Sequence, residues 1–344
     1  MNTRPFGKTG LEFPSIIFGS SALGNLFKSY TKAEKKQILK EAFKQTHPFT
    51  VFDTAGKYGA GLALEVLGEF LIEEGIPKEN VIITNKLGWT RIPLTTPEPL
   101  FEPNIWKGIE NDAVQKISYE GILECFEKDN ALLQGHVPQL ISLHDPDEYL
   151  DKANSEEERE ALWKDVLGAF TAMKELKDQG KVKGVGVGAK DWKIIKAIYQ
   201  RVPLDYVMIA NSLSLINHPP ELMKFVDLLR KDEVGIILAA IFQSGFLTGE
   251  DFFDYKRLDP DDAEDQKKIQ WRKKFFEVCK AYGVDPFHAC IQFSLMIPGV
   301  TSIALSVNQP ALVKKNLIAS ESSLPEGFWQ ELKDKSLISG FPNV

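Results

Sequence analysis

Short apolar runs alternate along the chain with longer segments whose apolar residues recur at helical spacing. The short runs have the length of buried strands, and the longer segments have the period of amphipathic helices. The predicted strands are Ser15–Gly19, Thr50–Phe52, Val81–Asn85, Gln139–Leu143, Val182–Val187, Tyr206–Ala210, Gly235–Ala240 and Thr301–Leu305. The predicted helices are a first one from the N-cap Thr31 to about His47, then Leu62–Glu74, Tyr119–Leu133, Glu158–Asp178, Trp192–Gln200, Pro220–Lys231, Ala263–Tyr282, Pro286–Met296 and Pro310–Ala319.

This alternation predicts an α/β fold, a single (β/α)₈ barrel that spans residues 1–344 without a linker between halves. The competing fold, a doubly wound sheet, needs a glycine-rich fingerprint after its first strand, and Gly19–Gly24 does not supply one. Before the first strand, the turn Lys8–Gly10 separates the extended pieces Thr3–Gly7 and Leu11–Phe13. We expect this hairpin to plug the N-terminal mouth of the barrel.

Three segments are too long to be plain connectors. Residues 87–113 carry aromatic residues and four prolines, and a loop of this length is typical of a lid or a binding loop; a packed surface loop is the alternative. The acidic stretch Asp145–Glu160 is expected to be a solvated lead-in to a helix. Within Ile241–Asp262, the run Gln243–Leu247 has Ser and Gly amides that suit a pyrophosphate.

Composition excludes several classes of protein. Apolar residues make up 43% of the 344 residues and charged residues 26%, as in soluble globular proteins, and the net charge of -7 argues against nucleic-acid binding. Ile236–Phe242 is too short to span a bilayer, and residues 1–20 contain no signal-peptide core. Cys125, Cys279 and Cys290 have no metal-ligand spacing and are predicted to be core residues in a reduced compartment. We therefore expect a cytoplasmic protein without a metal site.

Candidate chemistry appears where three consecutive strands end. The second predicted strand leads into Asp53, the third into Lys86 and the fourth into His144, and Tyr58 lies in the loop after the second. Tyrosine has a pKa of about 10, and a neighbouring ammonium lowers it toward the range of a general base. An Asp53–Lys86 pair would hold that ammonium in place, and His144 would orient the reacting oxygen.

The bland alternatives are a structural Asp–Lys pair and a histidine that is satisfied within the core. The joint occurrence of the four candidate residues at the catalytic face of a barrel favours proton transfer by Tyr58 instead. Hydride transfer then requires a cofactor, because no side chain performs that chemistry.

The four residues match the tetrad of the aldo-keto reductases, and the chain resembles that family from Phe6–Gly10 to Ile297–Gly299. The aldose 1-dehydrogenase branch (L-fucose, L-galactose and D-threo-aldose dehydrogenases) is the most similar, through Tyr58–Gly61, His144–Asp147 and Gly184–Gly188. The resemblance implies an NAD(P)-dependent oxidoreductase that oxidises an aldose at C1 to its lactone. Trp89 would supply an apolar face for the sugar.

Cofactor contacts follow from the same resemblance, with departures. The implied contacts are Gly19, Ser20, Asn211, Ser244, Gly245, Leu247, Ser306, Asn308 and Asn316. Many members hold the nicotinamide carboxamide with Ser-Asn after strand five and Gln after strand six. Here those positions are Gly188-Ala189 and Ala210, with Asn211 beside the latter.

The cofactor preference follows from two further positions. The basic residues that grip the 2′-phosphate in NADP-specific members are replaced by Ser306 and Leu312, although Lys314 and Lys315 are near. The sequence therefore predicts NAD over NADP. Two alternatives stay open: an NADPH-dependent reductase of small carbonyls, and a nucleotide-binding regulatory barrel like the potassium-channel beta subunits.

Overall fold

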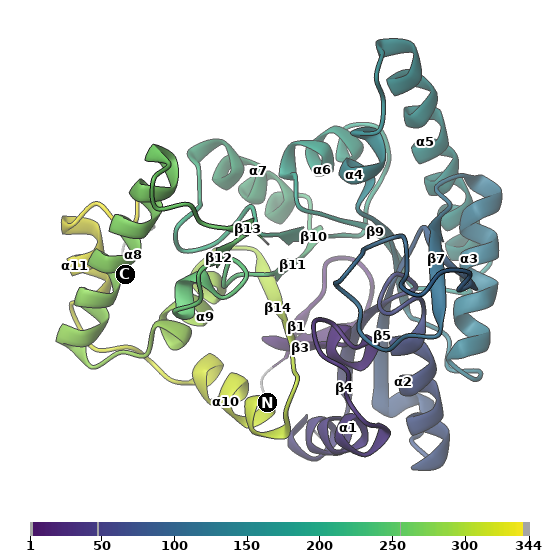
Figure 1. The fold of residues 1–344 in the computed structure, drawn as a ribbon, viewed down its shortest axis with the longest axis horizontal. Coiled ribbons are helices and arrows are strands. Elements are labelled where there is room, and N and C mark those ends of the chain that lie inside the picture. Colours follow the sequence, from purple (N-terminus) through teal and green to yellow (C-terminus); the bar gives the residue numbers. More distant parts are fainter. Residues whose placement is uncertain (1–2, 47, 255, 340–344) are drawn as a thin grey trace.

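The computed structural model describes residues 3–46, 48–254 and 256–339 (Figure 1). Eight parallel strands close into a barrel in which neighbours follow chain order, so the predicted (β/α)₈ barrel is confirmed. The barrel strands are β3 (Ile16–Gly19), β4 (Thr50–Ala55), β5 (Val81–Leu87), β8 (Leu140–His144), β9 (Gly184–Ala189), β10 (Tyr206–Ala210), β11 (Gly235–Ala239) and β14 (Val300–Ser306).

The helices lie outside the barrel, and most of them pack apolar residues against it (Figure 1). They are α1 (Lys32–Thr46), α2 (Leu62–Glu73), α3 (Tyr119–Leu132), α4 (Pro146–Leu150), α5 (Glu156–Asp178), α6 (Trp192–Tyr199), α7 (Pro220–Lys231), α8 (Ala263–Tyr282), α9 (Pro286–Met296), α10 (Pro310–Glu321) and α11 (Phe328–Asp334). The expected capping box at α1 is formed: Glu34 N–H donates to Thr31 Oγ1 at 3.2 Å, and Thr31 N–H donates to Glu34 Oε2 at 2.7 Å. His47, the expected end of this helix, lies outside the described residues. Among the described helices, none is both long and apolar enough to cross a membrane.

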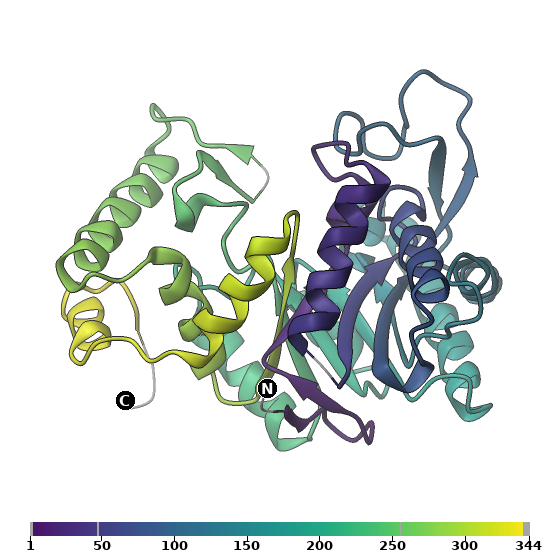
Figure 2. The same cartoon turned by 90° about the horizontal axis from the view of Figure 1, so that it is seen from below.

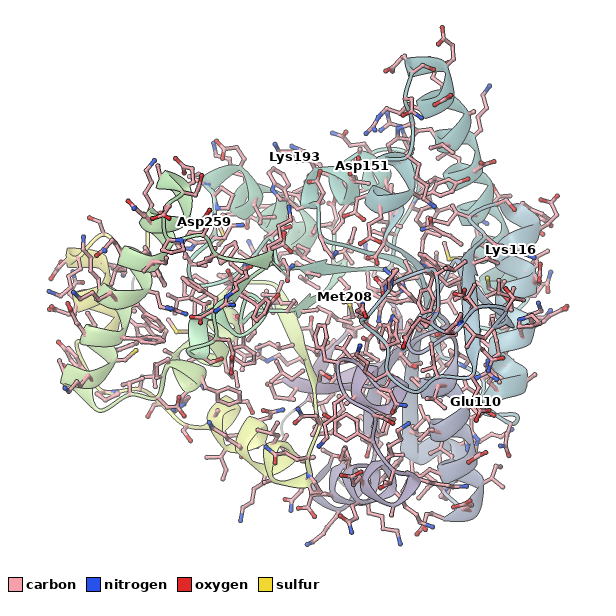
Figure 3. All side chains as sticks on the ribbon, in the orientation of Figure 1. Glu110, Lys116, Asp151, Lys193, Met208 and Asp259 are labelled. Carbon is pink, nitrogen blue, oxygen red and sulfur yellow. The ribbon has the colours of Figure 1, made fainter. Side chains whose placement is uncertain are left out.

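The glycine-alternating strand β9 explains how the barrel interior is filled. Its glycines face inward, and a Cβ added to Gly186 would lie 2.6 Å from a ring carbon of Tyr206. Tyr206 is fully buried, and Met208 on the same strand lies near the centre of the barrel (Figure 3). The glycines thus give up side-chain volume that larger residues of the neighbouring strand occupy.

The N-terminal hairpin closes the bottom of the barrel as predicted. Its strands are β1 (Thr3–Pro5) and β2 (Glu12–Pro14), and Figure 2 shows the hairpin at the lower end of the strands. Phe6 stacks on Phe13 with ring centroids 4.1 Å apart, and Phe6 also contacts the Tyr206 ring at 5.6 Å. The plug and the barrel interior therefore share one apolar cluster.

The long segment after β5 contains a β-hairpin. Strands β6 (Trp89–Pro93) and β7 (Asn111–Gln115) pair antiparallel, and the β6–β7 arm (residues 89–115) projects at the end opposite the N-terminal hairpin (Figure 2). The backbone N–H of Phe27 donates to the carbonyl of Ile105 at 2.8 Å, so the arm lies against the loop after β3. A second small hairpin, β12 (Phe252–Phe253) with β13 (Lys256–Arg257), follows β11.

Of the acidic stretch 145–160, expected to be a solvated lead-in to a helix, residues 151–160 are mostly exposed and lead into α5 as expected, but residues 145–147 are buried, so for these the expectation was wrong. Residues 146–150 form the short helix α4, which begins at a proline, a residue suited to the first turn. Asp147 is buried, and its Oδ2 accepts hydrogen bonds from the N–H groups of Lys190 (3.0 Å) and Asp191 (2.8 Å). These two hydrogen bonds from the loop after β9, which is distant in sequence, offset the free-energy cost of burying the Asp147 carboxylate.

The three cysteines are buried and free, as expected for core residues.

Asp129 is a buried acidic residue whose negative charge is costly in the folded protein. It lies on α3, is 3% exposed and accepts a hydrogen bond from Asn85 Nδ2 at 2.8 Å. Burial raises the pKa of Asp129 from 3.8 to about 7, against the opposing effects of Asn85 and Arg91. An acid with a raised pKa in the folded state costs stability wherever the unfolded chain ionises it first.

We predict that Asp129→Asn stabilises the protein near pH 8 and has little effect near pH 4. Wild-type stability should fall by up to about 4 kcal/mol as pH rises between these values, because one pKa unit corresponds to about 1.4 kcal/mol. The asparagine variant should lack this fall, since it has nothing to ionise. Urea unfolding at both pH values measures the difference, and a variant that is less stable than wild type near pH 8 would contradict the assignment.

Candidate active site

The structure brings the four candidate catalytic residues together at the C-terminal end of the barrel. Asp53 in β4 and Lys86 in β5 lie on adjacent strands, and Lys86 Nζ is 2.7 and 2.6 Å from the two Asp53 carboxylate oxygens. Lys86 Nζ also lies 4.8 Å from the centroid of the Tyr58 ring. The His144 ring, at the end of β8, is 5.8 Å from the Tyr58 ring and nearly perpendicular to it. The four residues therefore frame one reacting position.

Burial decides the charge states around Tyr58. Burial raises the pKa of Asp53, and the Lys86 ammonium opposes that rise through its two hydrogen bonds. Burial also holds the pKa of His144 well below 6.5, and the cations Lys86 and Lys57 push it in the same direction. His144 is therefore neutral near pH 7, a form in which one ring nitrogen donates a hydrogen bond and the other accepts one.

The loop that carries Tyr58 is fixed by close backbone contacts. Tyr58 N–H donates to the carbonyl of Ala55 at 3.1 Å, and Arg91 Nε donates to the carbonyl of Ala60 at 2.7 Å. Gly59 has φ of +61°, and a Cβ added there would lie 2.3 Å from the carbonyl oxygen of Gly24. Only glycine fits both requirements, so the loops after β3 and β4 can touch at this point.

Aromatic residues of the β6–β7 arm stand over the site. The Trp106 ring lies 5.8 Å from the Tyr58 ring and stacks on Phe101 at 6.4 Å. Trp89, the expected sugar platform, is 8% exposed; it contacts Phe101 at 5.8 Å and lies over Lys57 Nζ at 5.1 Å. Trp106 is therefore a further candidate for substrate contact. It lies next to Tyr58 in the structure although the two residues are far apart in sequence.

Candidate cofactor contacts gather on the opposite half of the rim, at the ends of β10, β11, β14 and β3. Gly19 pairs in register with Ser306, and Ser306 Oγ lies 2.7 Å from Ser21 Oγ. Asn211 follows β10, and its Nδ2 donates to Asp254 while its backbone carbonyl accepts from Gln243 Nε2 at 2.5 Å. Among the described residues, the buried Asn211 Oδ1 has no hydrogen-bond partner.

The residues present fit a nicotinamide. An unpartnered, buried amide oxygen costs free energy until a donor reaches it, and the carboxamide NH₂ is such a donor. Gly188 leaves space beside the tetrad: a Cβ added there would reach Lys86 Cδ at 3.4 Å and Met208 at 3.7 Å. Gly188 therefore offers no side-chain hydrogen bond to a carboxamide, and a Cβ there would make only ordinary contacts with Lys86 and Met208.

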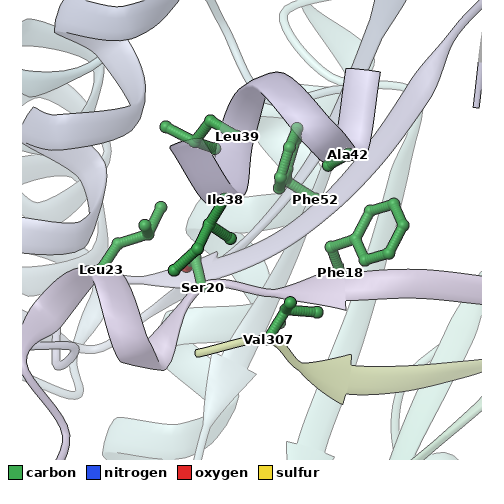
Figure 4. Close-up of a pocket in the computed structure, with 9 residues that line it drawn as sticks. Phe18, Ser20, Leu23, Ile38, Leu39, Ala42, Phe52 and Val307 are labelled. Carbon is green, nitrogen blue, oxygen red and sulfur yellow. The ribbon is translucent and has the colours of Figure 1, made fainter. Parts of the chain in front are cut away.

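Other implied cofactor residues have different surroundings. Ser20 is 2% exposed, and it lines a small void of about 10 Å³ among apolar side chains of α1 and β4 (Figure 4). Its backbone N–H donates to the carbonyl of Asp53 at 2.9 Å, so Ser20 helps to fix the backbone of a tetrad residue. The side chain of Asn316 is buried within α10, whereas Asn308 is exposed.

The loop after β11 uses its own amides. The N–H groups of Gly245 and Leu247 both donate to the carbonyl of Phe242 at 3.1 Å, and their contact with a pyrophosphate stays a prediction. Gln243, Ser244 and Gly245 all have positive φ, a conformation that is costly for the first two. Ser244 therefore remains the candidate phosphate contact here.

Sequence reasoning missed three residues near the rim. Gln243, 1% exposed, donates from Nε2 to the Asn211 carbonyl and to Ser214 Oγ. The Arg272 guanidinium lies 4.3 Å from the Phe246 ring centroid and donates to the Phe246 carbonyl at 3.3 Å. Lys57 contacts three carboxylates beside Tyr58. Of the three, only Lys57 could have been identified from the sequence, because it directly precedes the candidate catalytic tyrosine.

Comparison with known proteins agrees with this geometry. A model of the Aldo/keto reductase family matches residues 15–336. Pyridoxal 4-dehydrogenase of Microbacterium luteolum is 28% identical over 350 residues and covers 98% of each chain. D-threo-aldose 1-dehydrogenase of a Pseudomonas species is 25% identical over 345 residues and covers 96% of each. An aldo-keto reductase from Bacillus halodurans in its holo form shares the fold, with a TM-score of 0.71, 19% identity and coverage of 97% of this chain and 96% of the other.

We predict that Gly59→Ala destabilises the protein more than Gly75→Ala. Both glycines have positive φ, at +61° and +60°, so alanine costs similar backbone strain at each. Nothing lies within 4 Å of a Cβ at Gly75, whereas at Gly59 the Gly24 carbonyl must move. The extra cost should be roughly 1–3 kcal/mol, as for overpacking. Denaturant unfolding of both variants compares the two costs, and equal midpoints would show that the contact with Gly24 yields freely.

Proposed function

The chain belongs to the aldo/keto reductase family of NAD(P)-dependent oxidoreductases, and from that premise we propose that it oxidises an aldose at C1 to its lactone. The carrying observation is the convergence of Asp53, Lys86, Tyr58 and His144 on one position. In the proposed reaction the cyclic hemiacetal loses its hydroxyl proton and a hydride from the same carbon. The candidate sugars are L-fucose, L-galactose and D-threo-aldoses, a choice supported by similarity to D-threo-aldose 1-dehydrogenase.

Each side chain has a distinct part in the proposed mechanism. Tyr58 takes the proton from the hemiacetal hydroxyl, and Lys86 stabilises the phenolate that accepts it. Asp53 holds the Lys86 ammonium in place beside the tyrosine ring. Neutral His144 donates a hydrogen bond to the reacting oxygen and orients it. A bound nicotinamide supplies the hydride acceptor, and Asn211 and Ser306 would help to hold the cofactor.

Pyridoxal is a second candidate substrate, favoured by the aromatic wall of the site. Trp106 and Phe101 stack nearly parallel, with an interplanar angle of 14°, and Trp106 adjoins Tyr58. Such a wall suits a flat aromatic ring as well as the apolar face of a sugar. Pyridoxal closes on its own hydroxymethyl group to a cyclic hemiacetal, so the same oxidation would give a lactone. The 28% identity to a pyridoxal 4-dehydrogenase adds support.

A substrate panel with NAD tests the proposal. L-fucose, L-galactose, a D-threo-aldose and pyridoxal are each supplied, and formation of NADH and of the lactone is followed. Turnover of a sugar supports the first proposal, and turnover of pyridoxal alone supports the second. Reduction of small aldehydes with NADPH, without any of these oxidations, would support a carbonyl reductase. Nucleotide binding without turnover of any compound would support a regulatory barrel.

We predict that Tyr58→Phe lowers kcat by on the order of 10² or more, because it keeps the ring and removes the proton carrier. Affinity for NADH should be retained, since the cofactor contacts lie on the other half of the rim. Steady-state kinetics and an NADH binding titration measure the two quantities. Turnover near that of wild type would remove Tyr58 from the mechanism.

We also predict a higher kcat/KM with NAD than with NADP, by about tenfold or more. Leu312 offers no ligand for a 2′-phosphate, and Lys315 Nζ already pairs with Asp285 at 3.0 Å and lies 4.3 Å from the Phe287 ring centroid. A phosphate without a fixed partner gives up charge-assisted hydrogen bonds, which are roughly twice as strong as neutral ones. Kinetics with both cofactors on one substrate decide the preference, and Leu312→Arg should narrow it. A higher kcat/KM with NADP in wild type would refute the argument.

A further inference from the structure

A cluster of charges lies beside the candidate active site and has no role in the mechanism above; Lys57 and Asp145 are buried, whereas Glu102, Glu148 and Lys190 are partly exposed. Lys57 is 5% exposed, and its Nζ lies 3.0 Å from Asp145 Oδ2, 3.1 Å from Glu148 Oε2 and 3.0 Å from Glu102 Oε1. Lys190 Nζ pairs with the other oxygen of Glu148 at 2.9 Å. Three carboxylates thus face two ammonium groups, and Lys57 is the group that all three share.

One branch of the cluster reaches the catalytic histidine. Asp145 directly follows His144 and has φ of +49°, a conformation that is costly for a residue other than glycine. Its backbone N–H donates to the carbonyl of Gly188 at 2.9 Å, and its Oδ2 lies 3.5 Å from His144 Nε2. The same Oδ2 pairs with Lys57, so this ion pair partly neutralises the carboxylate and limits its electrostatic interaction with the imidazole.

The other branch reaches the β6–β7 arm. Glu102 contacts Lys57 through Oε1 and accepts a hydrogen bond from Trp106 Nε1 through Oε2 at 2.6 Å. The Trp106 ring lies beside Tyr58. A single carboxylate therefore links the ammonium beside the tetrad to the indole that covers it.

We propose that Lys57 is a positioning residue that holds His144 and Trp106 in place around Tyr58 through Asp145 and Glu102. The proposal rests on the proposed function, because it assigns Lys57 a role in the same reaction. Without the ammonium, Glu148 would keep its pair with Lys190, whereas Asp145 and Glu102 would lose the cation that they share, and Glu102 would lose its contact with the loop after β4. A buried charge that loses its partner is strongly destabilised, so both branches would rearrange.

The two branches have different signatures. The groups that face His144 are Lys86 from β5, Lys57 from the loop after β4, Asp145 and Glu148 around the start of α4, and Lys190 after β9. Tyr58 also contacts its ring. Loss of Lys57 removes one cation that lowers the pKa of His144 and exposes the imidazole to an unpaired Asp145. An imidazolium near the carbon that loses hydride opposes the positive charge that develops there, so activity should fall on the acidic side. Loss of Glu102 releases only the arm, and substrate affinity should fall instead.

The test compares Lys57→Met with Lys57→Arg, Glu102→Gln and the control Lys177→Met. Lys177 pairs with Asp205 at 2.6 Å, outside the catalytic cluster, so its removal samples the loss of a partly buried ion pair alone. We expect Lys57→Met to lower kcat/KM by on the order of 10² and to add an acidic limb to the pH profile. Lys57→Arg should recover activity and remove that limb. Glu102→Gln should raise KM about tenfold with kcat nearly unchanged, and Lys177→Met should behave as wild type.

Thermal unfolding and NADH binding establish that each variant is folded before its kinetics are compared. Wild-type kcat/KM and pH profile in Lys57→Met would overturn the proposal. So would a loss of activity without an acidic limb and without recovery by arginine, because that pattern marks a purely structural lysine. An unchanged KM in Glu102→Gln would overturn the arm branch.

A second readout does not require turnover, and it separates failure of this inference from failure of the proposed function. Limited proteolysis of the β6–β7 arm should be faster in Lys57→Met and Glu102→Gln than in wild type and Lys177→Met. If wild type oxidises none of the panel compounds, the proposed function fails while the link between Lys57 and the arm is still tested. Equal cleavage rates in all four proteins would overturn that link.

Discussion

The ion pair between Asp53 and Lys86 lies at the rim of the barrel, and the site is built around it. Both side chains are almost fully buried, and neighbouring strands bring them within 2.6 Å. Burying either charge alone would be strongly unfavourable, so each residue requires the other. The pair also aims an ammonium at the Tyr58 ring, which is the condition for proton transfer by a tyrosine near neutral pH. A structural requirement and a chemical one are thus met by the same contact.

Glycines beside and beneath this pair allow other groups to approach closely. Gly188 lies beside Lys86 on the next strand but one, and Gly186 yields its volume to Tyr206 beneath the site. Gly24 and Gly59 let the loops after β3 and β4 touch, and this contact places Tyr58. Glycine at such points costs conformational entropy on folding. These glycines lie where a side chain would contact a large or charged neighbour or a second loop.

The rim divides into two halves with different tasks. The tetrad and its charged neighbours occupy the ends of β4, β5 and β8, whereas Asn211, Ser244 and Ser306 lie at the ends of β10, β11 and β14. Because the strands are parallel and in chain order, β4, β5 and β8 carry the proposed proton chemistry, and β10, β11 and β14, with the adjoining β3, carry the proposed cofactor contacts. The β6–β7 arm covers the first half only, so a substrate and a nicotinamide would meet at the boundary near Gly188.

Sequence periodicity determined the barrel and its eight strands, because burial on a parallel barrel leaves a repeated apolar signature, and the turn at Lys8–Gly10 between two extended pieces predicted the N-terminal plug. It also placed Asp53, Lys86 and His144 toward strand ends and Tyr58 in the loop after the second strand, where chain order makes them neighbours. Tertiary structure decided what periodicity cannot encode. The arm became a hairpin with Trp106 over Tyr58, and Asp147 became buried by amides from residues 190 and 191. Lys57 acquired carboxylates from Asp145, Glu148 and Glu102, up to 91 positions away. Such contacts join segments that only the closed barrel brings together, so no local pattern of residues announces them.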